Sequence, residues 1–384
     1  MGWLITNGRT LSGDEMVVND VAVSGGTIAN APQPRMRRFD VAGHLVLPGI
    51  VDVHGDGFER QIQPRPGVNF GIDVALLETD QQLIMNGITT AFHGLTVSWE
   101  PGLRSVETAR TFVATLGRIR PRLSCDTRLH LRWETFAFDA LEEVLAWAAG
   151  EEGAILAFND HTTSMLERRK QKKNLPQWAA RAGLSEDSYL AMLETIWARR
   201  SEVEDAVADV AARALKQGAV LFAHDEANPE DRLKFRKLGI AACEFPMTAE
   251  TARVARDGGE HTILGAPNVV RGGSHTGAIN AAEAVAAGIC SVLASDYYYP
   301  SQLLAAFKLA ADGRVHLATA WDLVSKNAAE AAGLTDRGVL EPGRRADIAV
   351  IDDRDPALPR VVAVFVGGRL VLDRRGAFAV DATP

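Results

Sequence analysis

The sequence predicts an α/β protein: a (β/α)8 TIM-like barrel with a small β-sandwich domain formed by both termini. In the middle of the chain, eight apolar runs typical of buried parallel strands alternate with helical patterns. Each of these runs ends in polar residues. Short strand patterns also occupy both ends of the chain, and chain ends often lie close together in space.

The two terminal segments are expected to pair into one small domain. Residues 1–47 contain WLITNG and MVVNDVAVSGGTIAN, and residues 338–384 contain GVLEPGRRADIAVIDD and VVAVFVGGRLVLD. Turns rich in Gly and Asn separate these alternating apolar runs. Residues 48–337 are then expected to form the barrel, because one decorated catalytic barrel can fill this length. A doubly wound open sheet is the alternative.

Strands and helices of the barrel alternate along residues 48–337. Helical patterns separate most of the strands, such as LEEVLAWAAG, which ends at Gly150, and EVEDAVADVAARALKQG, which ends at Gly218. The longest connection runs from His161 to about Ala219 and has room for extra helices or a lid. The strand candidates are LVLPGIVDVHGD, ITTAFHG, RLHLRWE, AILAFNDH, AVLFAHDE, IAACEFP, TILGAPN and SVLASDY.

Composition and net charge indicate which classes of protein this chain can belong to. The net charge of −8 argues against nucleic-acid binding, which usually requires a basic surface. Three cysteines without a CxxC pair suit a reducing compartment. Neither a signal peptide nor a run of 18 apolar residues is recognisable, so we expect a cytoplasmic protein without a membrane partner. The oligomeric state stays open, with a homo-oligomer among the options.

The polar strand ends predict a metal site. His54 and Asp56 alternate on the first strand, so both side chains point to the same side and can chelate one divalent ion. His224 and Asp296 end later strands, at the barrel face that carries active sites. We therefore expect one or two divalent ions, with Zn²⁺ preferred and Mn²⁺ or Fe²⁺ compatible.

Several site residues keep alternative interpretations. Asp296 can bind an ion and take a proton from water as general base, or it can cap a helix. His161 is either a further ligand or a packed core side chain. Glu134 either bridges two metal ions or pairs with Arg132. His54 and Asp56 alone would also fit a solvated turn.

Two arginine-bearing loops predict an anionic small-molecule substrate, most simply a phosphate ester. In GAPNVVRGGSHTG, residues 265–277, glycines allow close backbone approach and Arg271 can clamp a phosphate. The segment ERQIQPRPGVNF adds Arg65 at the same face. Salt bridges between the loops are the alternative. The candidate substrate-binding residues are Arg65, Asn268, Arg271 and Ser274, and His275 is the candidate acid for the leaving group.

With these residues in view, the chain resembles the amidohydrolase superfamily. LPGIVDVHGD resembles its first-strand motif, and GVLEPGRRADIAVID resembles its returning β-domain. More narrowly, PRPGVNF, RLHLRWE, HDEA, EFPMTAE, GAPNVVRGGSH and SDYYYPSQLLAAF together resemble the PhnM family of the carbon–phosphorus lyase pathway.

This resemblance implies an activity and a ligand set. The implied reaction is hydrolysis of α-D-ribose 1-methylphosphonate 5-triphosphate to the 5-phosphate and diphosphate. The family's fourth strand end can carry a bridging lysine, which this chain lacks, and that favours Glu134 as the bridging carboxylate. The residues that carry over to the metal site are His54, Asp56, His224 and Asp296, with His161 as a further ligand.

One motif departs from the family pattern. Where the PhnM family is expected to have HTDN, this chain has HGDG followed by Phe58, Glu59 and Arg60, which are expected at the rim of the site. This difference keeps other functions open. A paralogue could act on another phosphorylated compound, or a deacetylase, deaminase or cyclic amidase could cleave a C–N bond. A non-catalytic scaffold on a retained barrel is the third alternative.

Overall fold

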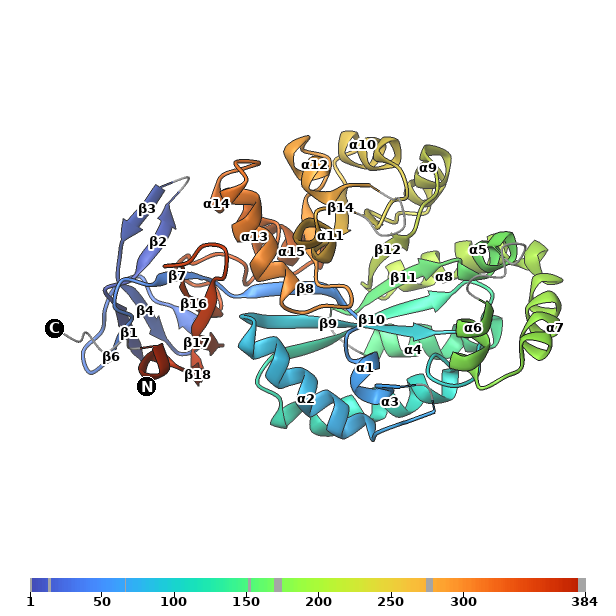
Figure 1. Cartoon of the computed structure of the whole chain (residues 1–384), viewed down its shortest axis with the longest axis horizontal. Helices are drawn as coiled ribbons and strands as arrows, with labels where there is room; N and C mark the ends of the chain where they lie inside the picture. The colour runs from blue at the N-terminus through green and yellow to red at the C-terminus, as the bar shows by residue number, and fades with distance from the viewer. Residues whose placement is uncertain are drawn as a thin grey trace.

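An eight-stranded parallel sheet forms the centre of the computed structural model, which describes residues 2–12, 15–65, 67–150, 153–168, 175–273 and 279–378. All eight expected strands are present, and they follow one another in chain order around the sheet (Figure 1). The (β/α)8 barrel is therefore confirmed. Its strands are β8 (Ile50–Gly55), β9 (Ile88–Val97), β10 (Asp126–Glu134), β11 (Ile155–Asn159), β12 (Val220–His224), β13 (Ala242–Glu244), β14 (His261–Gly265) and β15 (Val292–Ala294).

The first and last barrel strands meet next to the candidate metal ligands. Gly55 and Asp296 form an isolated parallel bridge. The amide of Asp296 donates to the carbonyl of His54 at 2.9 Å, and the amide of Asp56 donates to the carbonyl of Asp296 at 2.9 Å. The backbone that closes the barrel thus also fixes the spacing of His54, Asp56 and Asp296.

Helices cover the outside of the barrel, with α9 to α14 on one side and α2 to α4 on the other (Figure 1). No described helix has both the length and the apolar character needed to cross a membrane. The helices are α1 (Glu59–Ile62), α2 (Ile72–Met85), α3 (Val106–Ile119), α4 (Leu141–Gly150), α5 (His161–Arg168), α6 (Leu175–Ala182), α7 (Glu186–Trp197), α8 (Val203–Lys216), α9 (Pro229–Lys237), α10 (Ala249–Asp257), α11 (Ala266–Arg271), α12 (Ala281–Ala286), α13 (Ser301–Ala311), α14 (Leu317–Asp322) and α15 (Lys326–Ala331).

Strands from both termini form two smaller sheets at one end of the molecule (Figure 1). Their orders are β5-β4-β1-β6 and β18-β17-β16-β7-β2-β3. Ile5, Phe39, Val46 and Phe365 come from both sheets and share one buried apolar cluster, as the expected β-sandwich requires. The domain boundaries at 47/48 and 337/338 stay a prediction. The strands are β1 (Trp3–Thr6), β2 (Arg9–Ser12), β3 (Glu15–Val18), β4 (Val21–Ser24), β5 (Thr27–Ile28), β6 (Arg37–Asp40), β7 (Leu45–Pro48), β16 (Ile348–Asp352), β17 (Arg360–Val366) and β18 (Arg369–Asp373).

The run LVLPGIVDVHGD is two strands and not the single strand expected from the sequence. Leu45–Pro48 pairs with β16 in a terminal sheet, whereas Ile50–Gly55 pairs with β9 in the barrel. Gly49 separates them, and a Cβ at this position would lie 2.2 Å from Oγ1 of Thr89. Only glycine allows the chain to pass this close to β9 as it enters the barrel.

The long connection after His161 contains helices α5, α6 and α7, as expected. Their apolar side chains form a separate small core that includes Met165, Tyr189 and Leu193. Tyr189 donates its hydroxyl proton to Glu100, and Arg181 donates to the same carboxylate at 2.7 and 2.8 Å. Because Glu100 follows β9 and is buried, this contact fixes the helical segment to the barrel rim.

Candidate metal centre

Alternate residues of the barrel strands direct polar side chains toward the carboxyl ends of the strands. On β10, Leu129, Leu131 and Trp133 pack into the outer apolar core. His130, Arg132 and Glu134 therefore lie on the opposite face of the strand. All three are buried. The sequence signal of polar strand ends thus corresponds to an inward-facing polar cluster.

The candidate ligands form two neighbouring groups of three. His54, Asp56 and Asp296 have ligand atoms within 4.8 Å of one another. His161, His224 and Asp225 form a second such group. Five of the six residues expected at the metal site thus belong to these groups, and Asp225 was not expected. A further group consists of His54, His130 and Glu244.

Three residues at the site have a left-handed backbone conformation. Asp225, Phe245 and Asp296 have φ values of 58°, 51° and 55°, and each follows the end of a barrel strand. Such a backbone is costly for residues other than glycine, and it is concentrated at functional sites. This geometry explains how Asp225 comes to lie beside His224, a placement that strand alternation alone does not predict.

One carboxylate orients two of the histidines. Nδ1 of His54 donates to Glu244 at 2.8 Å, and Nδ1 of His224 donates to the other oxygen at 2.7 Å. Burial lowers the pKa of His54 to about 3, with a further contribution from Arg132, and lowers the pKa of His224. Both imidazoles are therefore neutral at pH 7, with Nε2 left as the unprotonated atom.

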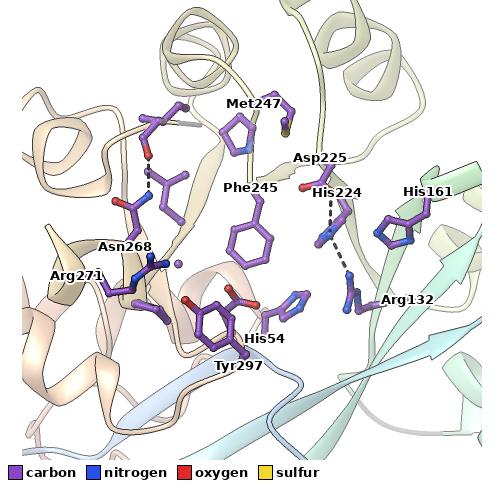
Figure 2. A pocket seen from close by; sticks show the side chains of 16 residues that line it. His54, Arg132, His161, His224, Asp225, Phe245, Met247, Asn268, Arg271 and Tyr297 are labelled. Carbon is purple, nitrogen blue, oxygen red and sulfur yellow. Dashed lines mark hydrogen bonds and ion pairs between the residues drawn. The ribbon is translucent and has the colours of Figure 1, made fainter. Parts of the chain in front are cut away.

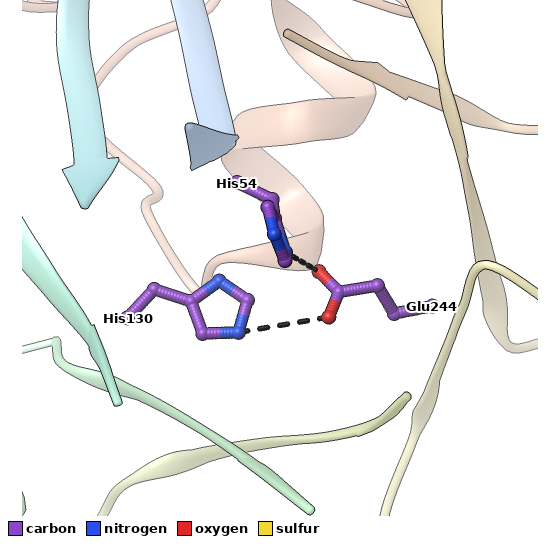
Figure 3. Close-up of side chains that lie close together, drawn as sticks. All are labelled: His54, His130 and Glu244. Carbon is purple, nitrogen blue, oxygen red and sulfur yellow. Dashed lines mark hydrogen bonds and ion pairs between the residues drawn. The ribbon is translucent and has the colours of Figure 1, made fainter. Parts of the chain in front are cut away.

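Glu244 lies at the centre of this arrangement, next to His54 and His130 (Figure 3). Its carboxylate has no exposed surface, and burial raises its pKa to about 6. His130 donates Nδ1 to the carbonyl of Val53 at 2.8 Å, which holds it as a core side chain. The sequence shows Glu244 only as one more polar strand end, so its role was missed.

These residues fit a divalent ion. Nε2 of His54 is buried and has no hydrogen-bond partner among the described residues, although a buried polar atom normally has one. A carboxylate behind an imidazole is the arrangement that orients histidine ligands in metalloproteins. Neutral imidazoles with carboxylates are the donor set that Zn²⁺, Mn²⁺ and Fe²⁺ accept.

Glu134 lies behind His161. It accepts from the backbone amides of His161 and Thr162 at 3.1 and 3.2 Å and from the Thr162 hydroxyl at 2.7 Å. Nδ1 of His161 is 3.2 Å from the same carboxylate. Glu134 thus holds the start of α5 and orients His161, and it is outside both ligand groups. Its assignment as a bridging ligand stays a prediction that this geometry does not support.

A cavity of about 290 Å³ opens over these groups. Figure 2 shows His161, His224 and Arg132 on one side of it and Arg271 with Asn268 on the other. The side-chain amide of Asn268 donates to Ile279 at 2.8 Å, and its oxygen accepts from Ala281 at 3.0 Å. Asn268 therefore joins the two described ends of the glycine-rich loop.

One other expected substrate-binding residue, Arg65, is not brought into this cavity. Arg65 is exposed and does not line it. Ser274 and His275 lie outside the described residues. Arg60 donates to the carbonyl of Tyr297 at 2.6 Å, so it supports a cavity wall.

Phe58 and Glu59 do not reach the rim where they were expected. Phe58 is buried against Phe112. Glu59 forms two hydrogen bonds with Arg104, at 2.9 and 3.0 Å. Both side chains therefore make contacts within the protein and do not face the cavity.

Comparison with known proteins agrees with this fold. The chain is 29% identical over 367 residues to the α-D-ribose 1-methylphosphonate 5-triphosphate diphosphatase of Escherichia coli (strain K12), covering 92% of this chain and 96% of that protein. A shorter stretch of 53 residues is 53% identical to an adenine deaminase of Methylobacterium nodulans, covering 14% of this chain and 9% of that protein.

Solved structures of low sequence identity share the fold. An amidohydrolase from a Sargasso Sea environmental sample has a TM-score of 0.68 at 15% identity, covering 98% of this chain and 94% of that one. The N-isopropylammelide isopropylaminohydrolase of Burkholderia multivorans has a TM-score of 0.65 at 18% identity, covering 97% and 99%. The family described as "Amidohydrolase family" matches residues 133–372, more than half of the sequence. The chain belongs to the amidohydrolase family.

Proposed function

We propose that this protein is a metal-dependent hydrolase that cleaves α-D-ribose 1-methylphosphonate 5-triphosphate to the 5-phosphate and diphosphate. The observation that carries the proposal is the cavity with candidate metal ligands on one side and the exposed cation Arg271 on the other. An anionic phosphate chain fits between two such walls. The similarity to a diphosphatase over nearly the whole chain supports the same substrate class.

One water is consumed in this reaction, the anhydride bond between the α- and β-phosphates breaks, and diphosphate leaves. One or two divalent ions, Zn²⁺ by preference, would supply Lewis-acid polarisation of a phosphoryl oxygen and a lower pKa for the attacking water. They would be held by His54, Asp56 and Asp296, with His161 and His224 nearby.

The protein's own groups carry the remaining steps. Asp296 accepts the proton of the attacking water as general base. Arg271 donates hydrogen bonds to the phosphate oxygens and stabilises the charge that develops on them. Asn268 keeps the phosphate-binding loop in shape. Ser274 is proposed to bind further phosphate oxygens, and Arg65 to attract the anionic substrate weakly from outside the cavity. His275 is proposed to protonate the leaving diphosphate.

The test is diphosphate release from the ribosyl triphosphate by Zn²⁺- or Mn²⁺-loaded protein. Asp296→Asn should lower kcat by at least about 100-fold, the usual contribution of a general base. Asp312→Asn, at an exposed carboxylate in a pair with Lys308, is the matched control and should keep full activity. Absence of diphosphate release by the loaded wild type would exclude this substrate.

Hydrolysis of a C–N bond is the second candidate. The short stretch of high identity to adenine deaminase favours it. Ammonia release from adenine, measured on the same metal-loaded preparation, separates the two proposals. Turnover of adenine faster than that of the ribosyl triphosphate would decide for deamination.

A further inference from the structure

The two ligand groups are joined by an arginine. Arg132 projects from β10, and only 5% of its surface is exposed. One of its terminal nitrogens is 3.3 Å from Oδ2 of Asp56, in the group formed with His54 and Asp296. The other is 3.1 Å from Nε2 of His224, in the group formed with His161 and Asp225. The guanidinium thus spans both candidate metal positions.

Arg132 and His54 both lie against Gly94 on the neighbouring strand. A Cβ at Gly94 would lie 3.4 Å from Cδ of Arg132 and 3.3 Å from Nε2 of His54. The arginine stem and the His54 ring therefore both pass close to this backbone. A guanidinium buried at such a position is held by its surroundings and is not a surface side chain that happens to turn inward.

The Arg132 guanidinium occupies different metal-binding atoms in the two ligand groups. Nε2 of His224 accepts a hydrogen bond from Arg132, so the lone pair that a metal ion would need is already used. Nε2 of His54 has no partner among the described residues. In the group of His54, Asp56 and Asp296, the guanidinium therefore contacts one of the two carboxylate oxygens of Asp56 and leaves the ring nitrogen of His54 untouched. In the other group it occupies the single lone pair of the His224 ring.

Electrostatics also favours metal binding by the group of His54, Asp56 and Asp296. The guanidinium of an arginine carries a permanent positive charge. A divalent ion bound by His224 would lie close to this fixed positive charge, and at short range in a partly buried site the repulsion is large. An ion bound by His54, Asp56 and Asp296 would also lie near the guanidinium, which contacts Asp56, but two carboxylates would offset the repulsion there, against one in the other group.

We infer that Arg132 restricts the centre to one tightly bound divalent ion, held by His54, Asp56 and Asp296, and that its guanidinium supplies the second positive charge of the site. The inference rests on the proposed metal dependence, but it concerns the number of ions and the residue that sets this number. It also assigns Arg132 a place beside the anionic substrate, because Arg132 lines the same cavity.

Metal titration of the intact protein tests this inference. Metal-free protein is titrated with Mn²⁺, and bound ions are counted by elemental analysis and by electron paramagnetic resonance, which detects spin-coupled pairs. The variants are Arg132→Gln, which removes the charge, and Arg132→Lys, which keeps it. Circular dichroism and thermal melting verify that both variants are folded.

The wild type and Arg132→Lys should each bind one equivalent tightly. Arg132→Gln should bind two and show a coupled pair, with a second dissociation constant roughly 100-fold or more tighter than that of the wild type. Two tight equivalents in the wild type or in Arg132→Lys, or one equivalent in Arg132→Gln, would overturn the inference. A wild type that binds no ion would instead refute the proposed metal-dependent function, so the two failures are distinguishable.

Discussion

The buried carboxylate of Glu244 accepts the Nδ1 proton of His54 at 2.8 Å. Its other oxygen accepts the Nδ1 proton of His224 at 2.7 Å, so one side chain fixes the tautomer of two imidazoles. The nearly parallel rings of His54 and His224, inclined by 17°, follow from this shared acceptor. The orientation of the candidate ligands therefore depends on a residue behind them.

Glu244→Gln should weaken metal binding by about 10- to 100-fold, as is typical when a partner behind a metal ligand is lost. A glutamine has one acceptor oxygen, so its amide group would face one of the two Nδ1–H donors. The metal dissociation constant, measured by competition with a chelator, tests this. Glu100→Gln is the matched control, because Glu100 is equally buried but binds Arg181 outside the cavity. Equal affinity in both variants would contradict the role given to Glu244.

The second glycine of the HGDG motif is explained by packing. A Cβ at Gly57 would lie 2.9 and 3.0 Å from Cε2 and Cζ of Tyr299, which is buried. Gly57→Ala should therefore lower the free energy of unfolding by about 1–3 kcal/mol, the usual cost of overpacking. Tyr299→Leu in the same chain should recover part of this loss, which a double-mutant cycle by urea unfolding measures.

A control for this cycle is available in α3. Gly117 has open space where its Cβ would be. Gly117→Ala should be neutral or stabilise the helix by up to about 1 kcal/mol. If Gly57→Ala behaved like Gly117→Ala, the contact with Tyr299 would not be the reason for the glycine.

The barrel could be predicted from the sequence because each of its strands can be recognised from a short stretch of consecutive residues. Each parallel strand is an apolar run that is buried on both faces, and each run ends in polar residues on the same side of the barrel. His54, Asp56 and Asp296 were found in this way, and the structure brings them together. The break at Gly49 was missed because it depends on Thr89, which is distant in the sequence.

Other parts of the site depend on contacts that no local pattern contains. Glu134 and Glu244 look alike in the sequence, as acidic residues at strand ends. Only the fold shows that Glu134 holds His161 and that Glu244 holds His54 and His224. Arg132 was considered only as a partner for Glu134, whereas it contacts Asp56 and His224.

His93 should make the stability of the metal-free protein depend on pH. It is buried against Phe58 and Phe112, and burial lowers its pKa to about 4. In the unfolded chain its pKa is about 6.5, so between these values the unfolded state binds more protons. The stabilising contribution is complete above pH 6.5 and is lost as the pH falls toward 4.

His93→Leu should therefore reduce the pH dependence of unfolding, by up to about 1.4 kcal/mol per pH unit between pH 6.5 and 4. Urea unfolding at several pH values measures this difference from the wild type. His316→Gln, at an exposed histidine, is the control and should leave the slope unchanged. Parallel curves for His93→Leu and the wild type would show that His93 is not the titrating group.

Arg271 should matter more for phosphate recognition than Arg65. Both side chains are exposed, but Arg271 lines the cavity opposite the metal ligands, whereas Arg65 lies outside it. Hydrogen bonds to charged groups contribute about 1.5–3 kcal/mol, so Arg271→Gln should lower kcat/KM for the ribosyl triphosphate by about 10- to 150-fold. Arg65→Gln should change it by less than about 5-fold, since a solvent-exposed charge pair outside the cavity contributes at most about 1 kcal/mol. Steady-state assays of diphosphate release over a range of salt concentrations measure both effects. A larger loss with Arg65→Gln than with Arg271→Gln would move the phosphate-binding site from the 265–273 segment to the loop that follows α1.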